Sequence, residues 1–193
     1  MKFFFGFLAF IAAIVVIVLL AVGLVRTWGD SGPATNVSTA IDLLGDNTEN
    51  SVARFTVEGP VVADENHKAI RITVSKNSRT VDVLSGYNGR VEKTSTIANT
   101  PEAYKAFLGA LAAARFANKT ATENGSPRDT CVTGAQYFFE LQLDSNKPVN
   151  TWTSSCSLKH GNFAGDATAT AQLFRSQIPN YGELTADVNV SPL

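Results

Sequence analysis

The chain has 193 residues, and its 16 basic and 17 acidic residues give a formal net charge of −1 at pH 7. Lys and Arg form no cluster along the sequence, so it lacks the basic stripe that nucleic-acid binding requires. Hydrophobic residues make up 45% of the chain, and many of them are concentrated in one run near the N-terminus. The remainder is long enough for one domain with its own core.

The N-terminal run predicts a membrane anchor. It begins at Phe3, ends at Val25 and contains neither charge nor proline. As a helix rising 1.5 Å per residue it would be about 34 Å long, which exceeds the roughly 30 Å of a hydrocarbon core. Lys2 precedes the run and Arg26 follows it, and so short a stub has little alternative to staying cytoplasmic. We therefore expect residues 1–26 to be a single-pass anchor in the lipid bilayer of the cell membrane, with the C-terminal domain external.

A cleaved signal peptide is a second interpretation of the same run. Ala21, Val22 and Gly23 offer small residues for a cleavage site. The apolar region of a signal peptide is normally only about 7 to 15 residues long, and this run is longer, so anchoring is the expectation.

The N-terminus also resembles the leader of type IV pilins and pseudopilins. Lys2 is followed by Gly6, Phe7 and an apolar helix, and the pilin signal is cut after a Gly that precedes a Phe. The resemblance covers about the first 25 residues and implies removal of the first six and a role as an assembly subunit. Pilins carry a Glu at the fifth position after the cut, where this chain has Ile11. They also continue the helix into the globular domain, whereas glycines and a proline at positions 29, 32 and 33 stop it here.

Residues 27–51 predict a flexible spacer, because Gly, Ser, Thr, Asn and Asp predominate and no long apolar period is present. Within the spacer, Ser38 favours the start of one short helix that carries Ile41 and Leu44 on one side and ends at Gly45. Because no basic residue accompanies this apolar patch, we expect it to dock on the domain rather than on lipid headgroups.

Residues 52–193 predict an external domain rich in strands. Apolar and polar residues alternate over residues 53–58 and 70–75, as is typical of half-buried strands. The Asn88-Gly89 pair favours a hairpin turn, and the polar residues 90–98 favour an edge strand. The cleanest alternation runs from residue 137 to residue 143, turns at residues 145–148 and predicts a central hairpin.

Two helices are expected among these strands. Thr100, Pro101 and Glu102 are a capping hydroxyl, an N-terminal proline and a first-turn acid, and apolar residues then recur at helical spacing up to Phe116. A second helix follows Asp166, and Pro179 ends it. Strands with two helices inserted later predict an α+β domain, an antiparallel sheet covered on one face by two helices. Residues 183–193 fit either a last strand or a frayed tail.

Cys131 and Cys156 are the only cysteines, and both fall in the part expected to lie outside. A disulfide between them would enclose the predicted hairpin and stabilise the domain by about 3 kcal/mol on the chain-entropy model, if the geometry permits. We expect this bond in an oxidising exterior, whereas a cytoplasmic domain would hold two free thiols. The spacing of 25 positions does not match the Cys-X-X-Cys pattern of a redox pair.

No catalytic, metal-binding or cofactor-binding residue is predicted. His67 lies beside Asp64 and Glu65, but such a run between strands is typical of a solvated turn. His160 lies in a loop, and the chain has no nucleophile motif to which it would serve as base.

Two further features have alternative interpretations. The backbone amides at Gly165 and Asp166 favour the binding of an anion, or the Asp166 side chain caps the second helix itself. Trp152 and Phe138 form either an exposed aromatic patch for a partner or a contact buried under the second helix.

These features together predict a membrane-anchored envelope protein whose external domain is a non-enzymatic binding or structural module. Its expected partner, besides the bilayer, is another envelope protein or the cell wall. The alternatives are a pilin-like assembly subunit and a small envelope enzyme of unknown reaction that uses His67 or His160.

Overall fold

The computed structural model of the chain describes residues 50–120, 126–156, 161–190 and 193. The chain divides into two compact units, Met1–Thr35 and Asn36–Leu193, and every described residue belongs to the second. The predicted anchor, the short helix of the spacer and His160 lie outside the described residues. In the part of the chain that is described, no helix is long and apolar enough to cross a membrane.

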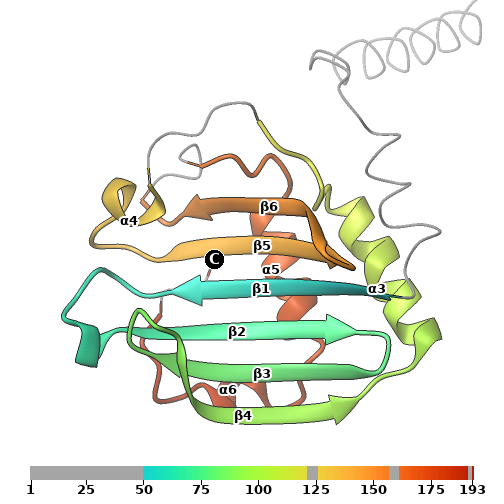
Figure 1. Cartoon of the computed structure of the whole chain (residues 1–193), viewed down its shortest axis with the longest axis horizontal. Helices are drawn as coiled ribbons and strands as arrows, with labels where there is room; N and C mark the ends of the chain where they lie inside the picture. The colour runs from blue at the N-terminus through green and yellow to red at the C-terminus, as the bar shows by residue number, and fades with distance from the viewer. Residues whose placement is uncertain (1–49, 121–125, 157–160, 191–192) are drawn as a thin grey trace, which may run out of the picture. The chain divides into compact units, whose positions relative to one another are not determined.

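The described part has the predicted α+β architecture, with six antiparallel strands in one sheet (Figure 1). The strand order is β4-β3-β2-β1-β5-β6. The bounds are β1 Ser51–Glu58, β2 Lys68–Ser75, β3 Ser78–Ser85, β4 Arg90–Ala98, β5 Gln136–Leu143 and β6 Asn146–Ser154. The polar strand β4 lies at one edge of the sheet, as its sequence predicts.

The predicted hairpin of β5 and β6 forms, but its predicted central position is wrong, because the two strands lie on one side of the sheet and β6 forms its second edge. The centre is occupied by β1, which pairs with β2 on one side and with β5 on the other. Its pairing with β5 runs from Ser51 opposite Leu143 to Glu58 opposite Gln136. Local alternation indicates a strand but not its distant partner, so the central place of β1 comes only from the tertiary structure.

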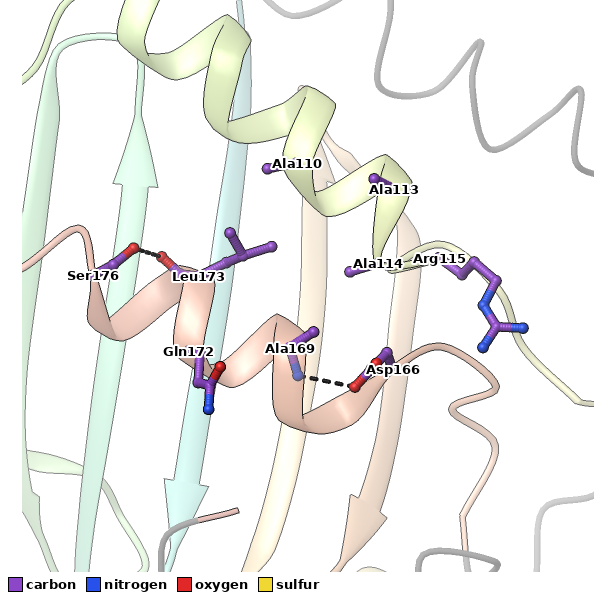
Figure 2. Close-up of a pocket in the computed structure, with 9 residues that line it drawn as sticks. All are labelled: Ala110, Ala113, Ala114, Arg115, Asp166, Ala169, Gln172, Leu173 and Ser176. Carbon is purple, nitrogen blue, oxygen red and sulfur yellow. Dashed lines mark hydrogen bonds between the residues drawn. The ribbon is translucent and has the colours of Figure 1, made fainter.

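One face of the sheet is apolar and covered by helices. In β1 the side chains of Ala53, Phe55 and Val57 are fully buried, whereas Arg54 and Thr56 between them are partly exposed. This alternation follows from the two-residue period of a strand. The helices α3 (Pro101–Ala113) and α5 (Ala167–Arg175) cross this face (Figure 2). The short α6 (Tyr181–Leu184) follows α5, and two more short helices, η2 (Asp64–Asn66) and α4 (Pro127–Thr130), lie in loops.

The start of α3 is the predicted one and its end is earlier. The Thr100 hydroxyl accepts a hydrogen bond from the Ala103 amide, so Thr100 is the N-cap. At the other end Arg115 adopts φ 58°, although its helical spacing predicts a place in the helix. The backbone amide of Phe116 donates a hydrogen bond to the carbonyl of Leu111 across this turn, which is a Schellman-type helix ending. The spacing of apolar residues does not predict where such an ending falls.

The second predicted helix is also capped as expected, since the Asp166 carboxylate accepts a hydrogen bond of 2.9 Å from the Ala169 amide. The helix ends at Arg175, before Pro179, and Ile178 is buried within the turns that follow. A helix usually ends before the residue that precedes a proline, so the early end agrees with local sterics.

The C-terminal segment is neither of the two predicted forms. Residues 181–184 are the helix α6, and the described residues after it form no strand. Val188, Val190 and Leu193 are partly buried against the core, and the segment passes close to Gly59. Apolar contact with the core therefore holds the tail in place without a ladder of backbone hydrogen bonds.

The centre of the core is a cluster of phenylalanines from the sheet and the helices. The ring of Phe55 lies 5.4 Å from that of Phe139 and 5.7 Å from that of Phe174, measured between centroids. Phe174 in turn meets Phe107 edge to face at 5.1 Å. Such pairs add to the stabilisation that burial itself provides.

Two buried tyrosines predict a loss of stability at alkaline pH. Burial raises the pKa of Tyr104 above its ordinary value of 10.0, although a hydrogen bond with Ser51 opposes this. Burial likewise raises the pKa of Tyr137. The unfolded chain ionises first, so the stability is present below about pH 10 and is lost as the pH rises through the pKa values of the folded state.

Urea titrations between pH 8 and pH 11 test this expectation. The midpoint of the parent chain should fall steeply above about pH 10. In the double variant Tyr104→Phe with Tyr137→Phe the fall should be shallower. Equal slopes for the two chains would contradict a role of these hydroxyls.

Candidate functional site

The face of the sheet opposite the helices is a candidate interaction surface. In Figure 1 the strands lie in front of α5 and α6, so this face is turned toward the reader. The strand registers place two rows of side chains across it. One row runs through Trp152, Phe138, Thr56, Arg71, Asp82 and Thr94, and the next through Asn150, Glu140, Arg54, Thr73, Thr80 and Thr96. The surface is thus polar and rich in threonine, with an aromatic pair at one side.

The charges on this open face are paired with one another. Arg71 donates two hydrogen bonds to one Asp82 carboxylate oxygen, at 3.0 and 3.2 Å, and the Thr94 hydroxyl donates to the other oxygen at 2.8 Å. Arg54 and Glu140 form a similar pair at 3.3 Å. Because these side chains are partly exposed, each pair contributes little stability, on the order of 1 kcal/mol or less. Their main effect is to hold the polar groups of the face in a regular, neutral array.

The aromatic pair of Phe138 and Trp152 does not lie under the second helix, which was one of its two predicted arrangements. Phe138 and Trp152 are opposite each other in the β5–β6 register, on the face that α5 does not cover. Burial of Trp152 under the second helix is therefore wrong, because its strand position points it to the other side of the sheet. Phe138 is half-buried and Trp152 is 7% exposed, so most of the indole is nevertheless withdrawn from solvent.

A second candidate site is a side-chain cluster beyond the end of β1, where His67, Tyr87 and Arg128 converge on Glu58. Arg128 forms two hydrogen bonds of 3.1 Å with the two carboxylate oxygens of Glu58, and its guanidinium lies 4.9 Å above the Tyr87 ring. The other ring contact of Tyr87 is with His67, at a centroid distance of 4.0 Å. His67 Nε2 lies 3.8 Å from a Glu58 oxygen. The cluster ties three loops to the sheet through charge and stacking.

The prediction that residues 64–67 form a solvated turn is wrong for His67. Its ring packs on Tyr87, and only 3% of its side chain is exposed. Neither ring nitrogen has a hydrogen-bond partner among the described residues. With so little exposure the imidazole is inaccessible to a substrate from solution. Within the described ranges, no group of three or more His, Cys, Asp or Glu side chains is arranged to hold a metal ion.

The structure joins Cys131 and Cys156 by a disulfide, with sulfurs 2.10 Å apart and Cα atoms 5.7 Å apart. Cys131 directly follows α4. Its backbone carbonyl accepts a hydrogen bond of 2.6 Å from the side-chain amide of Gln136, which is buried at the start of β5. The bond therefore attaches the segment that carries Arg128 to the end of β6.

The outer side of the helix layer carries a groove between α3 and α5, with a volume of about 610 Å³ (Figure 2). Most of its lining is apolar and small, contributed by Ala110, Ala113, Ala114, Ala169 and Leu173. Arg115 and Asp166 lie at one end of it. The Asp166 side chain caps α5 there, which is the simpler of its two predicted roles.

Sequence patterns did not predict the cluster of His67, Tyr87 and Arg128 around Glu58, nor the groove between α3 and α5. Arg128 lies between α3 and β5 in the short helix α4, and 70 positions separate it from Glu58. No spacing rule links such distant residues.

No protein-family model matches this chain, and the search of curated proteins found no matching relative. The function must therefore be argued from the site itself.

Proposed function

We propose that the chain is a single-pass envelope protein whose external domain is a non-enzymatic binding or structural module. The observation that carries the proposal is the open face of the sheet, an array of paired charges and threonine hydroxyls beside the half-buried ring of Phe138. Antiparallel sheets commonly leave one face to solvent, and the two arginines and the phenylalanine on this face belong to residue types that are enriched in protein interfaces.

One feature of the sequence and one of the structure support the external placement. The uncharged run from Phe3 to Val25 is long enough to span a bilayer as a helix. The disulfide between Cys131 and Cys156 is a bond that persists in oxidising compartments and is rare in the cytosol. The anchor confines the domain to the membrane, and the spacer sets how far it reaches.

Intact mass of the full chain purified from membranes tests the placement. Samples are alkylated before or after reduction, and the variant Cys131→Ser with Cys156→Ser is the matched control that gains no mass in either case. The proposal expects a full-length chain whose cysteines react only after reduction. Thiols that react without reduction would argue against an external domain. A chain beginning at Phe7 would indicate a pilin-like subunit, and one beginning near Leu24 a secreted protein.

Site-specific photo-crosslinking in intact cells tests the open face. A photoreactive residue at Thr73, in the middle of this face, should give discrete adducts, whereas one at Ala106, exposed on α3, should give none. Adducts from Ala106 alone would place the interaction on the helix layer and overturn this assignment. Adducts from neither position would argue against a binding role of the domain.

A further inference from the structure

The groove between α3 and α5 is lined mainly by small apolar side chains. Its alanine methyl groups leave room where larger residues would close the space between the two helices (Figure 2). A volume of about 610 Å³ lies within the range of sites that bind apolar groups. Leu173 lines one part of it and is only partly buried. An apolar ligand in the groove would therefore remove these methyl groups from water.

We propose that the groove binds Ile41 and Leu44 of the same chain. These two residues are three positions apart, so a helical turn presents them on one side and leaves the polar Asp42 on another. So short a helix is only marginal by itself in water, and it gains stability by burying its apolar side. The same contact would thus bury the apolar side of the short helix and the alanine methyl groups of the groove.

The length of the connection allows this placement. The hydroxyl oxygens of Ser51 and Tyr104 lie 2.9 Å apart, which holds the start of β1 beside α3. Ala110 follows Tyr104 by six residues (110 − 104), about 9 Å along the helix axis. The six residues from 45 to 50 that join Leu44 to Ser51 extend to about 20 Å. Leu44 can therefore reach the groove with enough chain left to pass around α3.

Docking would shorten the spacer. Residues 27–50 as a flexible chain have a root-mean-square span of about 27 Å, whereas residues 27–37 alone span about 18 Å. The bound segment would thus shorten the flexible connection between the domain and residue 27. This inference depends on the groove and the spacer, and it holds whether or not the N-terminal run is an anchor.

Hydrogen exchange of the full chain in detergent micelles, followed by mass spectrometry, tests the proposal. Amides of residues 38–44 should exchange about tenfold more slowly in the parent chain than in the variant Ala113→Glu, which places a charge in the groove. The matched control Lys105→Glu puts a glutamate on an exposed site of α3 that the helical period turns away from Ala110 and Ala113, and it should keep the protection of the parent chain. Exchange of the parent segment at the rate of an unprotected peptide would overturn the proposal.

A second variant keeps the test valid if Ala113→Glu fails to fold. Ile41→Asp combined with Leu44→Asp leaves the domain sequence intact, so residues 101–113 and 167–175 should keep their protection while residues 38–44 lose theirs. A segment that stays protected in this variant would overturn the docking. Protection that rises with protein concentration would place the segment of a second copy in the groove and overturn the intramolecular assignment.

Discussion

Substituting Phe139 by alanine is expected to lower the free energy of unfolding by about 3 to 5 kcal/mol. Phe139 is fully buried in β5, and its ring contacts come from both layers of the core. Its centroid lies 4.2 Å from that of Phe163, 5.4 Å from that of Phe55 and 6.4 Å from that of Phe116. Truncation removes these contacts and leaves a cavity that the rigid sheet can fill only in part, so the cost exceeds the lost burial alone.

The adjacent residue supplies the control for this prediction. Phe138 has the same chemistry in the same strand, but its side chain lies half-buried on the open face. The change Phe138→Ala should cost less than half as much, because solvent already reaches the ring and no closed cavity forms. Urea titrations followed by circular dichroism measure both variants. Equal losses would mean that the open face is as tightly packed as the core and would count against its assignment as an interaction surface.

Removing the disulfide is expected to have the second largest effect. The double variant Cys131→Ser with Cys156→Ser should be less stable by about 3 kcal/mol, since the bond limits the unfolded chain over a separation of 25 residues. A local loss should accompany this change, because the segment that carries Arg128 to Glu58 is no longer attached to the end of β6. Hydrogen exchange of residues 126–135 would report the local loss, and urea titration the global one.

Reduction of the parent chain is the matched comparison for the disulfide prediction. A reducing agent should lower the urea midpoint of the parent chain to that of the double variant and should not change the variant itself. If the parent chain keeps its midpoint under reduction, either the bond does not form in the isolated protein or it contributes no stability.

The proposed binding role depends on where the polar groups of the open face lie. Charged and hydroxyl side chains are spread over the open face and paired there, as in Arg71 with Asp82. The imidazole of His67, in contrast, is enclosed against Tyr87 and Glu58. Recognition by such a face would depend on many modest contacts distributed over it.

Local patterns in the sequence determined the class of fold and several of its details. Alternation over residues 53–58 and 137–143 predicted strands of the right type, because a strand turns successive side chains to opposite faces. Thr100 and Asp166 predicted the starts of both long helices, because a cap needs only the amides of the next turn. The pairing of Cys131 with Cys156 was predictable because the chain has no other cysteine.

Only the tertiary structure decided which distant residues meet. The central place of β1, the convergence of Arg128 and His67 on Glu58, and the groove between α3 and α5 all join segments far apart in the chain. Periodicity and capping depend only on residues within about one helical turn or one pleat of each other along the chain. The choice among distant partners depends on how the whole set of apolar faces is buried at once, which no single stretch of sequence contains.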